Sequence, residues 1–591
     1  MRPYQYTKLL DPSKEIRLLN LLPGEFSDPI RFTMRNASYI PPSIEEPSNS
    51  NRISLNELQR TLPPDWHAHE TLEGRYIFRF RSGPDGDTSW NHPDPQFNSR
   101  LLDDSGNRPV FEPEFEALSY VWGSTKTTET TYIHPSENDD QGTEMKTLEI
   151  GTNLATAMRH LRLQDQPRTI WADAMAINQM DENERNEQVK IMGHIYRHAR
   201  RVVVWLGLEA DNSNIAISAL EHLGHQIEAS KDFWLFVSPD AADKEVWNPQ
   251  VPLPFNQEEH AAVTALLQRP WFERLWTVPE IQLANDQAVA QCGSRQFQWS
   301  LFRRALHLAE TKVNLDRDFV TRCNGITRSV VSRKVPVAFV LRRVSRERKC
   351  SEPRDKLYAI LSLIGPTCAG KIEPQYSISI WKLYQDFFIT YLEFSQRLDL
   401  LPLVTIRNGS QQNNAQPSWI PDWNDGGSSG LEDQFRHFAA AVSKAHVRYP
   451  QDSVLEVTGA RTATISTLSE ILTAKVGKVI EIMGIKDISA DAKYVTGISL
   501  VDAYIRTLRS DIFREFLPVD LTAPTVEEAR EDILNRLQDL SKDYDEGNLF
   551  NIALRVIKWT KMRFVTTTDG HVGYVPFNAQ RGESVLLHHI N

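Results

Sequence analysis

The chain has 591 residues, with 66 Lys+Arg against 77 Asp+Glu, which gives a net charge of −11 at pH 7. Hydrophobic residues make up 40% and charged residues 24%, a balance that excludes collagen-like and wholly disordered proteins and, at this length, predicts several compact units. Eighteen apolar residues never run together, so no membrane span is expected. The acidic balance argues against a nucleic-acid-binding protein that works by neutralising phosphates.

The cysteines and the N-terminus indicate the compartment. None of the four cysteines forms a CxxC pair, which is typical of a reduced interior and argues against a Cys-based zinc site. The start, MRPYQYTKLLDPSKE, lacks the apolar core of a secretory signal. We therefore expect a cytoplasmic protein.

The first part of the chain contains short strands and a polar insertion. Residues 1–40 carry two strand-like pieces, at 4–9 and 15–21. Residues 41–111 are rich in Pro, Ser, Asn, Asp and Gly and are predicted to be a partly disordered insertion, with one ordered piece near 75–80.

In residues 112–293 strands alternate with helices. Strands are expected at 115–122, 169–177, 201–206 and 287–292, and helices are expected to start near Asn153, as an N-cap, and near Asp181 and Pro270. Repeated strand–helix–strand connections of this length predict an α/β fold: a parallel sheet with helices on both faces.

The remainder divides into a helical region, 294–424, and a mixed α/β region, 425–591. Helices are expected at 299–308, 335–344, 355–364, 381–394, 526–540 and 549–563, and strands at 455–458, 476–483 and 572–575. Polar linkers are expected at 408–418 and 425–430. The abrupt end at Asn591, directly after a strand-like segment, suggests a truncated C-terminus.

The common catalytic and metal-binding motifs are incomplete in this sequence. Residues 365–371 match GxxxxGK, but Ile372 replaces the hydroxyl that a phosphate-binding loop needs for Mg²⁺, and Pro374 opposes the helix that should follow. The His pairs at 67/69 and 222/225 lack a third ligand at metal spacing, so no metal site is expected. HExxH and GxGxxG are missing as well, and GGSSG at 426–430 lies in a predicted flexible turn and not in the elbow of a serine hydrolase.

A set of short segments in one order is more informative. They are FEALSYVWG at 115–123, Asn153-Leu154, WADAMAINQ at 171–179 followed by Asp181 and Glu184-Arg185, Gln188-Val189, Met192, Ile195-Tyr196, Ala199, VVVWLG at 202–207, RPWFERLW at 269–276, RDKLY at 354–358, WIPDW at 419–423, and GYVP at 573–576 with Gly582-Glu583. Together they resemble the HET (heterokaryon incompatibility) domain of filamentous fungi, over most of the chain outside the insertion.

The resemblance implies a cytosolic protein of a fungal self/non-self recognition and programmed cell-death system. It also implies a flavodoxin-like α/β domain similar to Toll/interleukin-receptor (TIR) domains. Some TIR domains cleave NAD with a glutamate that follows a tryptophan in a helix. Partners in an incompatibility pathway and self-association on activation are implied too. NAD would then be a substrate, and no cofactor is expected.

Glu280 is the candidate catalytic residue. Trp276 lies four residues before it, so the indole and the carboxylate could project from one helix face, and an anion stabilises the oxocarbenium-like state of nicotinamide–ribose cleavage. The alternative is a solvated or Arg-paired glutamate. Pro279, where the family usually has glutamine, could kink the helix and redirect Glu280.

The candidate binding residues lie at strand ends. Asp173 is expected on an apolar strand, either in contact with a ligand at the sheet's carboxyl edge or in a structural hydrogen bond. Asn178 and Gln179, at the carboxyl end of that strand, are expected to contribute to the same pocket. Asp181 and Glu184 have the spacing of a capping box, which is the favoured role of Glu184.

Side chains of a strand alternate between its two faces, so Tyr120 and Trp122 are expected on the same face. They either pack under the following loop or form an aromatic wall for a nucleotide ring. The family's usual cysteine in the second strand motif is Ala176 here, which removes a thiol nucleophile. Two hypotheses remain: an NAD-cleaving death effector, and a non-catalytic signalling module that works through protein contacts.

Overall fold

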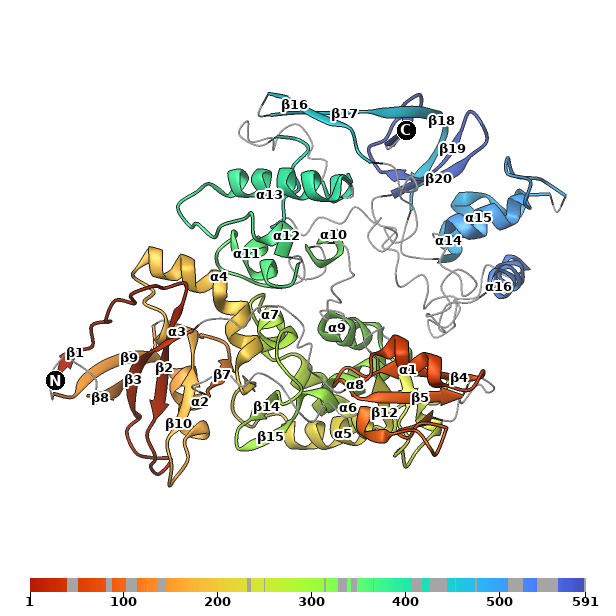
Figure 1. The fold of residues 1–591 in the computed structure, drawn as a ribbon. Coiled ribbons are helices and arrows are strands. Elements are labelled where there is room, and N and C mark those ends of the chain that lie inside the picture. The colour runs from red at the N-terminus through yellow and green to blue at the C-terminus, as the bar shows by residue number, and fades with distance from the viewer. Residues whose placement is uncertain are drawn as a thin grey trace. The chain divides into compact units, whose positions relative to one another are not determined.

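The computed structural model divides the chain into two compact units, Met1–Ile378 and Ser379–Asn591, which are described separately (Figure 1). The residues described are 1–39, 52–80, 88–102, 114–124, 126–135, 144–230, 235–248, 250–312, 315–327, 337–341, 348–364, 366–398, 400–404, 417–424, 444–451, 453–472, 476–489, 491–508, 525–538 and 562–588.

The first unit is organised around a ten-stranded sheet. Its strand order is β1-β9-β8-β3-β2-β10-β7-β11-β14-β15. The strands are β1 (Arg2–Pro3), β2 (Glu15–Leu21), β3 (Arg31–Ser38), β7 (Glu116–Ser119), β8 (Thr128–His134), β9 (Lys146–Gly151), β10 (Arg168–Trp171), β11 (Arg201–Trp205), β14 (Val289–Cys292) and β15 (Arg295–Gln298).

The predicted α/β class is confirmed, but the sheet is mixed rather than parallel throughout. Strands β10, β7, β11 and β14 are parallel neighbours. The N-terminal strand β2 pairs antiparallel with β10, and β15 pairs antiparallel with β14. The parallel centre is therefore flanked on both sides, and the N-terminal segment belongs to the same sheet.

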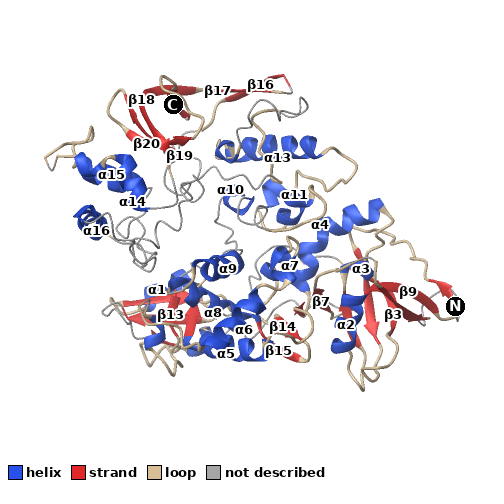
Figure 2. Cartoon of the chain, turned by 180° about the vertical axis from the view of Figure 1, so that it is seen from behind, coloured by secondary structure: helices blue, strands red, loops and turns tan. Residues whose placement is uncertain are grey.

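Both faces of the parallel centre are buried, as the apolar run in β11 predicts. Val202 and Val204 face one hydrophobic cluster and Val203 and Trp205 face another. Helix α2 (Thr152–Leu161) contributes to the second cluster and α4 (Glu182–His198) to the first. Figure 2 shows the sheet from behind, with α2 and α3 beside it.

The second parallel strand is shorter than predicted. Strand β10 ends at Trp171, and the chain then turns into the short helix α3 (Asp173–Ala176), whose first bond runs from the Ala176 amide to the Ala172 carbonyl at 2.8 Å. The alanines and methionine that were read as an apolar strand are good helix formers. Asp173 is thus at a helix start and not on a strand, which corrects the prediction.

Helix α2 also begins differently from the prediction. Its N-cap is Gly151 and not Asn153, and the Asn153 side chain instead bridges two strand ends. The Asn153 amide donates to the Val121 carbonyl at 2.6 Å and its oxygen accepts from the Trp205 indole at 3.1 Å.

The polar insertion contains more regular structure than the single piece predicted. Residues 52–80 and 88–102 hold α1 (Leu55–Thr61), η1 (Ser99–Leu101) and a sheet of β4 (Trp66–Glu70), β5 (Tyr76–Phe80) and β6 (Thr88–Ser89). The ordered piece expected near 75–80 is β5, so that prediction is confirmed. Residues 41–51 and 103–111 lie outside the described residues.

The rest of the first unit is mainly helical. Its elements are α5 (Ser213–Gln226), β12 (Ile227–Ala229), β13 (Leu235–Val237), η2 (Glu245–Trp247), α6 (Gln257–Leu267), η3 (Pro270–Glu273), α7 (Thr277–Gln282), α8 (Trp299–Thr311), α9 (Arg317–Thr327), α10 (Val337–Val340), α11 (Asp355–Leu361) and α12 (Pro366–Ala369). The single helix expected from Pro270 is instead two short ones, η3 and α7.

The second unit mixes helices and antiparallel strands. Its elements are α13 (Ile380–Ser395), η5 (Leu401–Leu403), β16 (Val447–Gln451), β17 (Val454–Val457), β18 (Gly459–Ile471), α14 (Val476–Met483), η7 (Ile485–Asp487), α15 (Leu500–Leu508), α16 (Val526–Gln538), β19 (Met562–Thr567), β20 (Val572–Pro576) and β21 (Ser584–His588). Its four-stranded sheet has the order β20-β19-β18-β21.

One predicted strand of this unit is wrong. Residues 476–483 form helix α14, because Val479, Ile480 and Met483 recur at helical spacing and pack into one cluster with α15. The predicted strand at 572–575 is β20, and the linkers at 408–416 and 425–430 and most of the helix expected at 549–563 lie outside the described residues. Among the described helices, none has the length and apolarity needed to cross a bilayer.

Candidate functional site

Polar side chains gather where the parallel strands end. Ser119 closes β7, Tyr120 and Trp122 follow it, and Asp173 stands just past the end of β10. Arg274 and Glu280 reach the same place from the segment between η3 and α7 and from α7 itself. These six residues are called the strand-end cluster below.

Glu280 is enclosed at the centre of this cluster, with 2% of its surface exposed. The Ser119 hydroxyl donates to its Oε2 at 2.5 Å, and the Trp271 indole donates to the Ser119 oxygen at 2.9 Å. Burial raises the pKa of Glu280 to about 7, opposed by the Arg274 charge and reinforced by the Asp173 charge. A carboxyl group that titrates near neutral pH therefore lies at the carboxyl end of a parallel strand.

Asp173 and Trp122 form the outer part of the cluster. The Trp122 indole donates to Asp173 Oδ2 at 2.8 Å, and the Ala174 amide donates to Oδ1 at 2.7 Å. Asp173 is buried, whereas 36% of the Trp122 surface is exposed. The structural hydrogen bond, one of the two roles left open for Asp173, is therefore present, and the Trp122 ring remains accessible beside it.

Arg274 connects the outer part to Glu280. Its guanidinium donates to the Tyr120 carbonyl at 2.6 Å and lies 5.6 Å from the Trp122 ring centre. The charge of Arg274 lowers the pKa of Glu280. The Tyr120 ring is buried in the core, and burial followed by the Asp173 charge raises its pKa well above the usual value.

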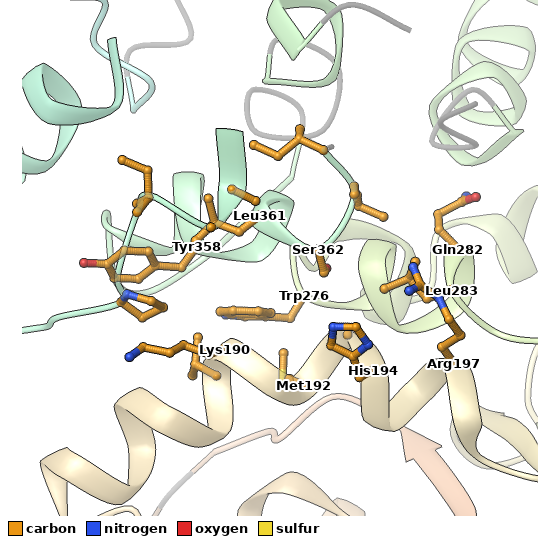
Figure 3. Close-up of a pocket in the computed structure, with 18 of the residues that line it drawn as sticks. Lys190, Met192, His194, Arg197, Trp276, Gln282, Leu283, Tyr358, Leu361 and Ser362 are labelled. Carbon is orange, nitrogen blue, oxygen red and sulfur yellow. The ribbon is translucent and has the colours of Figure 1, made fainter. Parts of the chain in front are cut away.

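Trp276 does not join the strand-end cluster, although it lies four residues before Glu280. Its indole donates to Asp355 Oδ2 at 2.8 Å, and Tyr376 donates to Oδ1 of the same carboxylate at 2.8 Å. Its ring lines a separate cavity between α4, α7 and α11 (Figure 3). The prediction that one helix face directs Trp276 and Glu280 into one hollow is therefore not met.

Asn178 and Gln179 lie at the margin. The Gln179 amide donates to the Asp173 carbonyl at 3.2 Å. The Asn178 amide N–H donates to Glu184 at 2.7 Å, and its side-chain oxygen accepts from the Met180 amide at 3.2 Å. Gln179 thus supports the loop around Asp173, while Asn178 is engaged with the start of α4.

Glu184 does not complete a capping box, which corrects the favoured prediction. Asp181 caps α4 as expected and accepts from the Asn183 and Glu184 amides, both at 3.1 Å. The Glu184 carboxylate turns inward and pairs through both oxygens with Arg17 of β2, one bond being 2.8 Å. Arg17 and Glu184 are 0% and 2% exposed, so this is a fully buried ion pair.

Pro279 causes no kink. It is the third residue of α7, in the first turn, where a backbone N–H has no partner within the helix. The helix starts at Thr277, later than the sequence indicates, so the carbonyl of Leu275 lies outside it. Pro279 therefore fits its position.

Three residues of these sites were missed from the sequence. Arg274 lies inside the RPWFERLW segment, Asp355 inside RDKLY, and Ser119 inside FEALSYVWG, so each belongs to one of the segments that resemble the HET domain. Nothing in the spacing shows that Asp355 receives the Trp276 indole, because the two residues are 79 positions apart. Burial raises the pKa of Asp355 to about 6.

The cluster combines the Glu280 carboxyl group, whose pKa is raised to about 7, with the Asp173 side chain, the Arg274 guanidinium and the accessible Trp122 indole. Such a set suits polar recognition of a cation or ring and general acid–base or charge-stabilising chemistry. The part of the chain that the structure describes contains no group of three or more His, Cys, Asp or Glu residues arranged to hold a metal ion.

Comparisons with known proteins bear on the same residues. Residues 115–280 match the family model described as heterokaryon incompatibility protein (HET). The chain is 28% identical over 369 residues to heterokaryon incompatibility protein 6, OR allele, of Neurospora crassa, an alignment that covers 53% of each chain. The chain thus matches about half the length of that relative, and no solved structure matches it.

The matched range begins at Phe115, next to β7, and ends at Glu280, so it contains every residue of the strand-end cluster. Residues 115–280 therefore match the HET family model, and over about half of its length the chain is similar to a fungal heterokaryon incompatibility protein.

Proposed function

We propose that this chain acts in fungal heterokaryon incompatibility, a self/non-self response that ends in programmed death of the fused cell, and that its HET domain is the part that acts. The observation that carries the proposal is the HET match over 115–280, the range that holds the strand-end cluster. The similarity to the Neurospora protein supports it. The work would take place in the cytoplasm, with pathway proteins as partners and self-association on activation.

The first test is genetic. Induced expression of the full chain in a filamentous fungus should arrest growth and kill fused cells, and deletion of the gene should remove incompatibility between strains that differ at its locus. Growth unaffected by expression, together with unchanged incompatibility after deletion, would contradict the proposal.

For the mechanism, we propose that the strand-end cluster cleaves NAD⁺, as the TIR-like resemblance implies. The observation that favours it is a buried carboxyl group with a pKa of about 7 beside Arg274 and Asp173. The bond from ribose C1′ to the nicotinamide nitrogen breaks, and its electron pair leaves with nicotinamide. The Glu280 carboxylate stabilises the ribosyl cation, water adds to C1′, and the proton of that water is released.

The geometry sets one condition on this chemistry. Because Glu280 is only 2% exposed, a substrate reaches it only after the groups around it move apart. The Trp122 ring, already accessible, would then contact the nicotinamide or adenine ring. Self-association is the step that we expect to produce this opening.

Nicotinamide release by purified, concentrated protein tests the mechanism. Glu280→Gln should reduce release by about a hundredfold or more, since it removes the ionisable group. Glu273→Gln is the matched control, because Glu273 lies on neighbouring η3 and pairs at the surface with Lys349. Release from the wild type should rise with pH through about 7 as Glu280 ionises.

A non-catalytic signalling module remains the second candidate, and the enclosure of Glu280 by Ser119 and Trp271 favours it. In that case Glu280 stabilises the fold, and death follows from protein contacts alone. Absence of nicotinamide release from assembled wild-type protein, with Glu280→Gln still lethal in the fungus, would select this candidate over NAD cleavage.

A further inference from the structure

The polar insertion forms a small module with a hydrophobic core of its own. Residues 52–80 and 88–102, called the insertion module below, hold a cluster that includes the fully buried Leu58 and Phe78. The other members of this cluster also lie between residues 53 and 102. Within the described part of the chain, no residue of the module belongs to the clusters on the two faces of the ten-stranded sheet. The apolar packing that stabilises the module is therefore internal to it.

Hydrogen bonds inside the module join α1 to its strands. The Gln59 side chain of α1 accepts from the Ala68 amide at 2.9 Å and donates to the Trp66 carbonyl at 3.0 Å. The Tyr76 hydroxyl donates to the Ile53 carbonyl at 2.8 Å. Because these bonds need no residue from another part of the chain, they can persist if the module separates from the rest of the unit.

The module meets the rest of the first unit at β12, β13 and α8 (Figure 1). This junction is called the seam below. Hydrogen bonds cross the seam from Leu72 N to Ala229 O at 2.8 Å, from Thr88 Oγ1 to Val237 O at 2.7 Å and from Trp90 Nε1 to Asp240 Oδ2 at 2.8 Å. Water can replace each of these bonds when the seam opens, so the net cost of breaking them is small.

A buried charged cluster completes the seam. Glu73, in the turn between β4 and β5, pairs with Arg304 of α8 at 2.8 Å, and Arg304 pairs with Glu228 of β12 at 2.8 Å. The side chains of Glu73, Arg304 and Glu228 are 13%, 9% and 3% exposed. In such a cluster, the cost of removing the charges from water offsets most of their attraction, so the cluster sets the position of the module more than it strengthens docking.

Phe236 of β13 adds an apolar contact to the seam. Its ring centre lies 4.8 Å from the ring centre of His69 and 5.9 Å from the guanidinium carbon of Arg79, and both partners belong to the module. Phe236 is 3% exposed and would meet water if the module left. Burial of this ring therefore helps to keep the seam closed.

The charged cluster makes closure of the seam depend on pH. Burial raises the pKa of Glu228 to about 7, the charges of Arg304 and Arg75 oppose this rise, and those of Glu73 and Asp240 add to it. When the seam opens, the Glu228 carboxyl group meets water and its pKa falls toward the usual 4.5. The closed form thus holds a proton more tightly, so closure is favoured at low pH and weakens as pH rises from about 4.5 to about 7.

We propose that the insertion module is a detachable element, which separates from β12, β13 and α8 as a folded unit and uncovers Phe236 and Arg304. Its internal core allows it to remain folded, and its polar, charged seam resembles the transient interfaces between domains. The inference does not rest on NAD cleavage, because the seam contacts named here include no residue of the strand-end cluster.

Hydrogen–deuterium exchange of the full-length protein, read by mass spectrometry at single-residue resolution, tests the proposal. The Leu72 amide reports on the seam, and the Leu58 amide, which donates to the Ser54 carbonyl at 2.8 Å, reports on the module's own fold. After correction for intrinsic exchange rates, Leu72 should exchange at least about tenfold faster than Leu58. The corrected Leu72 rate should also rise about tenfold between about pH 5.5 and about pH 7.5, while the Leu58 rate should change much less.

Three variants separate the contributions. Glu73→Gln removes the charge that the module brings to the cluster and should raise the corrected Leu72 rate about tenfold without changing the Leu58 rate. Glu228→Gln cannot ionise and should abolish the pH dependence at Leu72. Asp65→Asn is the matched control, because Asp65 is an exposed acid of the same module, and both amides should exchange as in the wild type.

Equal corrected rates at Leu72 and Leu58, in the wild type and in Glu73→Gln, would overturn the proposal, because the module would then unfold rather than separate. A Leu72 rate that is independent of pH in the wild type, or that still depends on pH in Glu228→Gln, would overturn the role of the charged cluster. A faster Leu72 amide in Glu73→Gln, with Leu58 and the Asp65→Asn protein unchanged, would support the proposal.

Discussion

Two buried glutamates of the first unit, both within the range that matches the HET family model, have contrasting surroundings. Glu184, at the start of α4, is paired through both oxygens with the fully buried guanidinium of Arg17. Glu280, in α7, has a serine hydroxyl as its close partner, and burial raises its pKa to about 7. A matched ion pair serves the fold, whereas a buried acid whose pKa is raised toward neutrality marks a candidate functional group.

The largest effect should come from breaking the matched pair. Arg17→Met leaves the Glu184 carboxylate buried without its cation and should lower the free energy of unfolding by about 3–5 kcal/mol. Denaturant unfolding followed by circular dichroism measures it. The double variant with Glu184→Leu should recover most of the loss, and a double variant as unstable as the single one would show that the ion pair is not the cause.

Glu280, which has no such ion pair, should make the free energy of unfolding depend on pH. Because the pKa of Glu280 is higher in the folded chain than the usual 4.5, folding favours the protonated form, and the stability of the wild type falls as pH rises from about 4.5 to about 7. Glu280→Gln cannot ionise, so its stability relative to the wild type should improve over this range by the order of 3 kcal/mol. A difference that is constant with pH would contradict the raised pKa.

A smaller effect is expected at the accessible rim of the cluster. Trp122→Phe removes the indole hydrogen bond to Asp173 and should cost about 1 kcal/mol, because the tryptophan is partly exposed. Trp90→Phe is the matched control, since its indole donates to Asp240 at the same 2.8 Å in an exposed position. Unfolding midpoints of the two variants compare the stability lost with the Trp122–Asp173 and Trp90–Asp240 hydrogen bonds. An equal loss would show that the bond to Asp173 contributes no more than an exposed one.

The smallest effect should come from Pro279. Since it occupies the first turn of α7 without losing a helix hydrogen bond, Pro279→Ala should change stability by less than about 1 kcal/mol and leave the pH dependence attributed to Glu280 intact. A large gain in stability would show that the proline strains α7.

Local pattern predicted the parallel centre well. The run Val202–Trp205 reads as a strand buried on both faces, and both faces are in fact covered. The hydrophobic pattern gave the wrong secondary structure where a short apolar run fits both the two-residue repeat of a strand and the 3.6-residue repeat of a helix. Residues 173–176 and 476–483 were read as strands, yet both are helices, because alanine, methionine and the spacing of Val479, Ile480 and Met483 suit a helix.

The candidate site was predicted in part. Asp173, Trp122, Tyr120 and Glu280 were all chosen from the sequence, and the structure brings them to one sheet edge. The partners that decide their chemistry come from distant positions: Ser119 is 161 residues from Glu280. Local spacing cannot supply such contacts, and it directed Trp276 to the wrong side of α7.

The central claim is that Glu280 is a buried acid that titrates near neutrality. Infrared difference spectra between the wild type and Glu280→Gln, recorded across pH, test it directly through the carbonyl stretch of a protonated carboxyl group. We expect a protonated-carboxyl band that is present at pH 6 and lost by pH 8, centred on the pKa of about 7. A spectrum in which position 280 is already ionised at pH 5 would contradict the account.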